Sequence, residues 1–357
     1  MSTAQLQIRP GDLIAHKYRV ERVLGAGGMG MVVAAQHLHL GQRVALKFML
    51  PGSIDNPTAL ERFFREAQLA FRLSSEHVAR VLDVGTLNDG TPFIVMEHLT
   101  GTNLADLLER VVQLPVPRAV DYVLQAAAAL AEAHALGIVH RDLKPANLFL
   151  TARPDGSPLV KVLDFGISKA NVGLGTGGGA LTKTNRAIGS PQYMAPEQIA
   201  APKTVDRRAD IWGIGVLLYE LCSGRVPFEA SSIPDLCLKI VREPAPLLSG
   251  PGIPPAFAAL VARCLERDPN KRFADVAELA EQLAFFSETG ARTSLKRIGG
   301  VSRMEKTPPV QVLAPAGPVT EEDIQIDVVM GDGTMELADE DLGLGKTMAD
   351  DRSKRSG

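Results

Sequence analysis

The run His140-Arg141-Asp142-Leu143-Lys144-Pro145-Ala146-Asn147 constrains this chain more than any other stretch of its sequence. It places a carboxylate, a cation and a carboxamide close together on one expected loop. Asp142 can orient a hydroxyl group and accept its proton. Lys144 can neutralise charge on a moving phosphoryl group, and the amide oxygen of Asn147 suits Mg2+. The run therefore predicts a loop that brings a hydroxyl, a phosphate and a hard metal ion together.

The bulk composition indicates a globular chain with room for one large domain or two moderate ones. Of its 357 residues, 45% are hydrophobic and 22% are charged. Cys222, Cys237 and Cys264 lack metal-ligand spacing, and their odd number favours free thiols in a reducing cytoplasm. No signal-peptide pattern is present, and the longest apolar run, 211–222, is too short to cross a bilayer. We therefore expect a cytoplasmic protein without a membrane span.

Charge is distributed unevenly along the chain. Residues 291–357 hold 9 Lys and Arg against 12 Asp and Glu, whereas residues 1–290 hold 29 of each. This neutral balance over 1–290 argues against a basic surface that binds nucleic acid. Pro308-Pro309, scattered glycines and alternating charge blocks predict a disordered tail over 291–357.

Hydrophobic periodicity divides the remainder into two parts. Strands are expected at 18–24, 31–36, 43–48, 78–87 and 93–97, with one helix at 59–73. From Leu104 onward helical patterns dominate, with helices expected at 120–136, 208–223, 255–266 and 274–286. The pattern predicts an α+β fold: a small five-stranded antiparallel lobe with one main helix, then a larger, mainly helical lobe.

A glycine-rich sequence, Gly25-Ala26-Gly27-Gly28-Met29-Gly30, lies between two of the expected strands. The pattern Gly-x-Gly-x-x-Gly alone is a weak signal, because dinucleotide-binding folds share it. Those folds continue from the motif into a helix, whereas this chain returns to a strand. A glycine hairpin can close over triphosphate oxygens as a flap. An ordinary glycine-rich turn remains the alternative.

Lys47 ends the strand-like run Val44-Ala45-Leu46-Lys47 and alternates with apolar neighbours, so we expect its side chain in a cleft. The helix at 59–73 offers Glu66 as an acidic partner. Glu61 competes for that role but lies a turn or more earlier in the helix. A surface lysine and a solvent-facing glutamate are the alternatives.

Two further motifs, Asp164-Phe165-Gly166 and Ala195-Pro196-Glu197, follow the loop at 140–147. In this order the motifs resemble those of bacterial eukaryotic-type (Hanks-type) serine/threonine protein kinases, and Lys144 resembles the serine/threonine branch. The resemblance covers about four-fifths of the chain. It implies a bilobed domain over residues 15–290, with lobes at about 15–97 and 100–290, after an extension over 1–14. The implied reaction transfers the γ-phosphate of ATP to Ser or Thr hydroxyls of protein substrates.

The resemblance also implies a role for individual residues. Asp142 and Lys144 would act with an ion pair of Lys47 and Glu66 in catalysis. Asn147 and Asp164 would bind Mg2+ or Mn2+. The adenine ring would contact the backbone that joins the lobes, with Met96 behind it as gatekeeper. The residues implied for ATP binding are Leu24, Gly25, Ala26, Gly27, Gly28, Met29, Gly30, Val32, Ala45, Lys47, Met96, Glu97, Leu99 and Phe149.

The segment from Asp164 to Glu197 contains hydroxyl side chains beside a glycine-rich stretch at 173–179. Its candidate phosphosites are Thr176, Thr182, Thr184 and Ser190, of which Thr182 and Thr184 are preferred. Autophosphorylation in a transient homodimer would give Arg141 an anionic partner and order the segment. A mobile loop without regulation is the alternative.

Two residues further along bear on the substrate class. Asp210 resembles an aspartate that bonds the backbone of the loop at 140–147, and Arg272 resembles an arginine that pairs with Glu197. Small-molecule kinases generally lack these elements, so a protein substrate is favoured over that rival. A pseudokinase scaffold is the second rival, although such proteins usually lack Lys47, Asp142 or Asp164.

The tail contains threonines that could serve as phosphosites. Thr334 and Thr347 precede Leu337 and Asp350 by three positions, and Thr307 precedes Pro308. This spacing resembles ligands of phosphothreonine-binding FHA domains, so we expect such a partner for an autophosphorylated tail. An unregulated, solvated linker is the alternative.

Overall fold

The computed structural model describes residues 8–27, 30–49, 56–165, 191–201, 204–288 and 292–305. These residues belong to one unit of the chain, 1–308. Gly28, Met29 and residues 166–190 lie outside the described part, together with residues 306–357. Among the described helices, none has the length and apolar composition needed to span a membrane.

The N-terminal lobe is built on a six-stranded antiparallel sheet with the order β1-β2-β3-β4-β6-β5. Its strands are β1 (Leu13–Ile14), β2 (Tyr18–Gly27), β3 (Gly30–His37), β4 (Arg43–Phe48), β5 (Val81–Thr86) and β6 (Pro92–Glu97). One face buries alternate residues such as Val33, Leu46 and Val95. Five of these strands correspond to the predicted ones. β1 is too short for a period-two pattern to predict it.

The expected extension over residues 1–14 packs in part on the sheet, through residues 8–14. Ile8 and Ile14 are buried in the core of the sheet, and β1 pairs with Arg19 and Tyr18 of β2. Burying two isoleucines removes apolar area from water, which explains why this segment joins the lobe.

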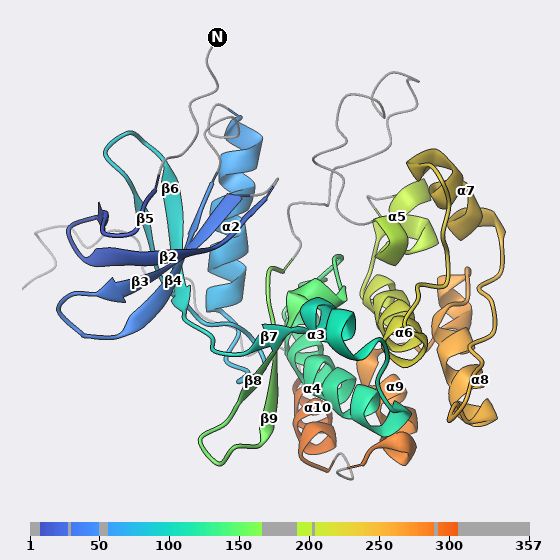
Figure 1. Ribbon diagram of the computed structural model, residues 1–357. Coiled ribbons are helices and arrows are strands. Elements are labelled where there is room, and N and C mark those ends of the chain that lie inside the picture. The colour runs from blue at the N-terminus through green and yellow to red at the C-terminus, as the bar shows by residue number, and fades with distance from the viewer. Residues whose placement is uncertain are drawn as a thin grey trace, which may run out of the picture. The chain divides into compact units, whose positions relative to one another are not determined.

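Helix α2 (Pro57–Phe71) lies against the sheet, as Figure 1 shows. Asn56 caps it by accepting hydrogen bonds from the backbone N–H groups of Thr58 and Ala59. Phe63 and Ala67 of its buried face pack beside Ile94 of β6. Glu66 lies between these two residues in the sequence, and its carboxylate contacts Lys47 of β4.

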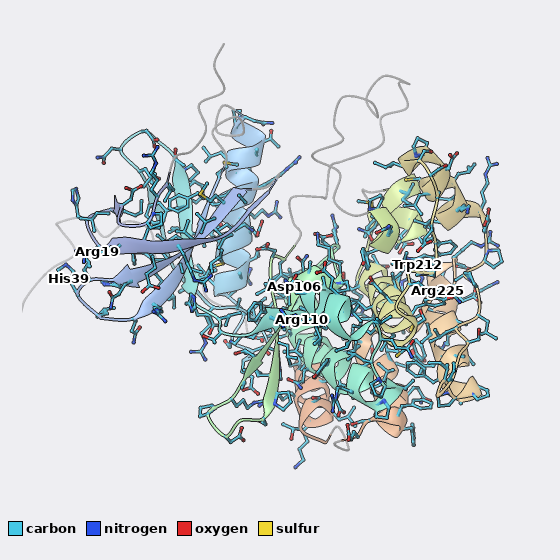
Figure 2. The ribbon with its side chains drawn as sticks, viewed as in Figure 1. Arg19, His39, Asp106, Arg110, Trp212 and Arg225 are labelled. Atoms are coloured by element: carbon cyan, nitrogen blue, oxygen red, sulfur yellow. The ribbon has the colours of Figure 1, made fainter. Side chains whose placement is uncertain are left out.

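The C-terminal lobe is mainly helical and surrounds two almost wholly buried helices, α4 (Val116–Ala135) and α6 (Arg208–Ser223). The other helices are α3 (Leu104–Val111), α5 (Pro196–Ala200), α7 (Ile233–Arg242), α8 (Pro255–Cys264), α9 (Val276–Leu283) and α10 (Arg292–Glu305). Trp212 of α6, which Figure 2 labels, is fully buried, and its ring stacks on that of Phe228. Gly213 lets Leu143 pack closely against α6, because a Cβ at position 213 would lie 3.0 Å from the Cβ of Leu143.

A second, three-stranded sheet lies at the edge of this lobe, in the order β7-β8-β9. It consists of β7 (Thr102–Asn103), β8 (Leu148–Ala152) and β9 (Pro158–Val162). The loop between α2 and β5 is joined to β9, because Val162 N–H donates to His77 O at 2.7 Å and Ala79 N–H donates to Val162 O at 3.1 Å. The loop that follows α2 is therefore joined by hydrogen bonds to the strand that leads to Asp164.

Helix α10 corrects the predicted extent of the disordered tail. Residues 292–305 form a helix that packs on α4 and α9 instead of an irregular segment. Ile298 is 1% exposed, and Leu295 and Val301 on the same face contact the core. Arg297 pairs with Glu76 of the α2–β5 loop, which Arg153 also contacts at 2.9 Å. The glycine pair at 299–300 weakens the helical signal, and packing outweighs that loss.

We predict that Ile298→Ala lowers the free energy of unfolding by about 2–5 kcal/mol, because it leaves a cavity beneath α10. Lys296→Ala on the exposed face of the same helix should change it by less than about 0.5 kcal/mol. Chemical denaturation of the whole chain measures both values. Equal effects would show that α10 does not pack as described.

Candidate active site

Lys47 lies at the centre of the polar groups that face the cleft between the lobes. Its Nζ is 2.9 Å from Glu66 Oε1 and 2.6 Å from Asp164 Oδ1, and its side chain is 9% exposed. Burial alone would lower the pKa of Lys47, but the carboxylates of Asp164 and Glu66 outweigh burial and raise it. Lys47 therefore stays cationic. Of the two candidate partners in α2, the structure brings Glu66 to Lys47 and leaves Glu61 exposed.

The loop at 140–147 gathers its polar groups as the sequence suggests. Lys144 Nζ is 3.2 Å from Asp142 Oδ2. Asn147 Nδ2 donates to Asp142 O at 2.8 Å and to its Oδ2 at 3.3 Å. Because the side-chain nitrogen Nδ2 is turned toward Asp142, the side-chain oxygen Oδ1 of Asn147 is left for another partner. Arg141 and Asp164 adopt positive φ angles of 64° and 47°, a strained conformation that often marks functional loops.

Asp210 of α6 holds the backbone of the loop at 140–147 by hydrogen bonds. Its Oδ1 accepts the N–H of Arg141 at 2.8 Å, and its Oδ2 accepts the N–H of His140 at 2.9 Å and contacts His134 Nε2 at 2.8 Å. Burial of Asp210 would raise its pKa, but the hydrogen bond from His134 and the neighbouring groups lower it below the ordinary value. Asp210 thus stays ionised and makes the backbone contact expected of it.

His140 links the same loop to the segment that carries Asp164. Its Nε2 lies 3.1 Å from Leu163 O, and its ring lies 4.9 Å from the ring of Phe165. Burial lowers the pKa of His140, so the ring is neutral and can donate through one nitrogen. The carboxylates of Asp142 and Asp164 are therefore held by neighbouring, hydrogen-bonded segments.

Arg272 and Glu197 form the ion pair that the sequence predicts. Two parallel hydrogen bonds join them, from Nη1 to Oε1 at 2.7 Å and from Nη2 to Oε2 at 2.8 Å. The Arg272 side chain is 0% exposed, and it also donates to Arg208 O and Glu266 O. Through the further hydrogen bond to Arg208 O, the pair holds α5 against the start of α6.

A cleft of about 670 Å3 separates the sheet of the N-terminal lobe from β8 and the start of α3. Nine of the predicted nucleotide-binding residues line it: Leu24, Gly25, Val32, Ala45, Lys47, Met96, Glu97, Leu99 and Phe149. Ala26, Gly27 and Gly30 are not among the lining residues, and Gly28 and Met29 lie outside the described part. Strand register explains the grouping, because Val32 pairs with Lys47 and Ala45 pairs with Met96.

Glycine is required at the end of the hairpin over this cleft. Gly30 has a φ of 151°, and a Cβ at this position would lie 2.2 Å from Phe48 O. Strand β3 therefore approaches β4 more closely here than any other residue would allow. The motif returns directly into a strand, unlike the strand-to-helix turn of dinucleotide-binding folds.

Some cleft residues were not predicted. Asp106, on the first turn of α3, and Asn103, which caps that helix, line the mouth (Figure 2 labels Asp106). The Asn-x-x-Asp spacing predicts a helix start, but it gives no sign that the helix faces a cleft. Thr176, Thr182, Thr184 and Ser190 lie outside the described residues. Arg141, their expected partner, donates from Nη2 to Val205 O at 3.2 Å.

The lobed fold and this arrangement of Lys47, Glu66, Asp142 and Asp164 are those expected of a protein kinase domain. Residues 18–285 match the protein kinase domain family, and the chain belongs to that family. It shares 39% identity over 277 residues with serine/threonine-protein kinase pkn3 of Myxococcus xanthus, covering 76% of this chain and 50% of that protein.

Other relatives agree with this assignment. Serine/threonine-protein kinase PknH of Mycobacterium tuberculosis is 40% identical over 282 residues, covering 78% of this chain and 43% of PknH. The crystal structure of a mutant PknI kinase domain from Mycobacterium tuberculosis is similar, with a TM-score of 0.62 and 27% identity over 79% of this chain and 99% of that one. The chain spans about half the length of the curated relatives it matches. The family, the fold class and the bacterial serine/threonine resemblance are thus confirmed.

We predict that Arg272→Ala lowers the free energy of unfolding by about 3–5 kcal/mol, because it leaves the Glu197 carboxylate without its buried partner. Arg43→Ala, which breaks the exposed pair with Glu21, should cost less than about 1 kcal/mol. Urea denaturation followed by tryptophan fluorescence reports both, since Trp212 lies 5.2 Å from the Arg272 guanidinium. A small loss for Arg272→Ala would contradict its assigned position.

Proposed function

We propose that this chain is an ATP-dependent protein kinase that phosphorylates Ser and Thr hydroxyls of proteins. The observation that carries this proposal is the contact of Lys47 Nζ with both Glu66 and Asp164 at the inner wall of the cleft. A lysine held in this way presents a fixed positive charge to the phosphates of a nucleotide. Family membership supports the same reaction.

ATP would bind with its adenine ring between Val32 and Ala45 on one side and Phe149 on the other. These three residues line the cleft, and their side chains form apolar walls suited to a flat ring. The backbone at Glu97 and Leu99 would hydrogen-bond the edge of adenine. The hairpin at 25–30 would cover the triphosphate, with Lys47 contacting the α- and β-phosphates.

The residues present fit a divalent metal ion. Asp164 supplies carboxylate oxygens and Asn147 a carboxamide oxygen, and such hard oxygen donors suit Mg2+ or Mn2+. The orientation of Asn147 supports this, because its side-chain nitrogen Nδ2 donates to Asp142 O and its side-chain oxygen Oδ1 is left to bind the ion. When bound, such an ion would offset negative charge on the phosphate oxygens.

Asp142 would orient the acceptor hydroxyl for in-line attack on the γ-phosphate and accept its proton. Its carboxylate is held by Lys144 and Asn147, which limits its rotation before the substrate arrives. Lys144, beside Asp142, would neutralise charge that develops on the transferred group. Holding the hydroxyl and the phosphate in register supplies much of the rate in reactions of this kind.

The substrate class is proposed from the C-terminal lobe. The pair of Arg272 and Glu197 fixes α5 beside Tyr193, whose hydroxyl donates to Glu220 at 2.7 Å. A surface that is fixed in this way supports docking of an extended polypeptide better than a small molecule. A pseudokinase scaffold is disfavoured because Lys47, Asp142 and Asp164 are all present and Lys47 contacts Asp164.

We propose that phosphorylation of the chain regulates it in two places. Autophosphorylation within 176–190 in a transient homodimer would give Arg141 an anionic partner. Phosphorylated Thr334 or Thr347 of the tail would recruit an FHA-domain protein in the cytoplasm. Mapping phosphosites after incubation with ATP tests both points, and the absence of tail phosphothreonine would exclude the second.

We predict that Asp142→Asn lowers kcat by roughly 10²–10⁴-fold, because the amide cannot accept the hydroxyl proton. Transfer of labelled phosphate from ATP to a generic protein substrate measures this effect. Asp155→Asn, in the exposed turn between β8 and β9, is the matched control and should retain full activity. Equal and poor labelling by the wild type and Asp142→Asn would favour the scaffold instead.

A further inference from the structure

Lys161 is a buried cation beneath the cleft, on β9, three positions before Asp164. Its side chain is 8% exposed. Its Nζ donates to Glu97 Oε1 at 2.6 Å and to Val78 O at 3.2 Å. A buried ammonium group is costly unless it is neutralised and hydrogen-bonded, so both contacts must be kept for the fold to tolerate it.

The two acceptors belong to segments that shape the nucleotide site. Glu97 ends β6 and lines the cleft, where its backbone is the proposed contact for adenine. Val78 also lines the cleft and lies in the loop that follows α2, the helix that carries Glu66. Lys161 therefore contacts both Glu97, at the adenine end of the cleft, and the loop that follows α2.

The Glu97 carboxylate is anchored a second time. Its Oε1 accepts the N–H of Arg80 at 2.8 Å, while the backbone N–H of Glu97 donates to Arg80 O at 3.0 Å. The end of β6 is thus attached to the α2–β5 loop by its backbone and, through Lys161, to β9 by its side chain. Removing the ammonium group would leave this carboxylate with one donor instead of two among the contacts described.

We infer that Lys161 is a positioning residue for nucleotide binding. It holds the backbone at Glu97 and Leu99 in the orientation that adenine requires, and it does so without touching the nucleotide. This inference rests on the proposed function, because it assumes that adenine binds along this edge. A charge-assisted hydrogen bond at a buried site is strong enough to fix that edge within the cleft.

The sharpest test compares nucleotide preference in variants of the whole chain. Lys161→Met keeps the length of the side chain but removes its charge. We expect the KM for ATP to rise about tenfold with little change in kcat, because a charge-assisted contact to the adenine edge is lost. The preference for ATP over GTP, as a ratio of kcat/KM values, should fall by a similar factor. Lys161→Arg should recover part of both.

Two further variants separate positioning from general stability. Lys239→Met removes a lysine that also donates to a backbone oxygen, Glu229 O, but lies far along the chain on α7, and it should leave both values unchanged. Lys161→Met/Glu97→Gln removes the carboxylate that Lys161→Met leaves without a cation, and it should recover the melting temperature but not the ATP preference. If the double variant restored the preference, or if Lys161→Met left it intact, the inference would be overturned.

Equilibrium binding of ADP distinguishes failure of this inference from failure of the proposed function. If the wild type transfers no phosphate but binds ADP, and Lys161→Met weakens that binding about tenfold, Lys161 positions the site and the kinase proposal fails. If transfer occurs and ADP affinity does not change in Lys161→Met, the kinase proposal stands and the inference fails.

Discussion

The contact of Lys47 with Glu66 and Asp164 is the interaction on which the rest of this structure depends. It joins β4 to a helix residue 19 positions away and to a loop residue 117 positions away. A buried cation is stable only while both carboxylates remain close, so α2, β4 and the end of β9 must keep one relative arrangement. In that arrangement the cleft has one charged wall, and a phosphate can approach it.

The C-terminal lobe supports this contact with buried charges of its own. Asp210 of α6 bonds the backbone of the loop that carries Asp142, and Arg272 joins Glu197 to the backbone oxygen of Arg208 at the start of α6. At the proposed adenine end of the cleft, the buried Lys161 bonds the Glu97 carboxylate in a similar way. Each of these buried charged groups is hydrogen-bonded to specific partners, and each therefore fixes geometry more surely than it adds stability.

The sequence predicted the polar site better than the boundaries of the fold. Lys47, Asp142 and Asp164 stand in motifs with fixed order, so their convergence followed from the motifs alone. Strand β1 and helix α10 were missed, because a two-residue strand has no period and a glycine pair conceals the helical pattern of 292–305. Lys161 was also missed, since its partner Glu97 lies 64 positions away and nothing local indicates a buried lysine.

The measurement that most directly tests this account compares two glutamates of α2. Glu66→Gln removes the charge that faces Lys47, whereas Glu61→Gln changes an exposed glutamate of the same helix. If the Lys47 contact organises the site, kcat/KM for ATP should fall about 100-fold in Glu66→Gln, because the phosphates lose their fixed position. Glu61→Gln should retain activity within about twofold, as expected for a surface change. Equal activity of the two variants would contradict the central role given to Lys47.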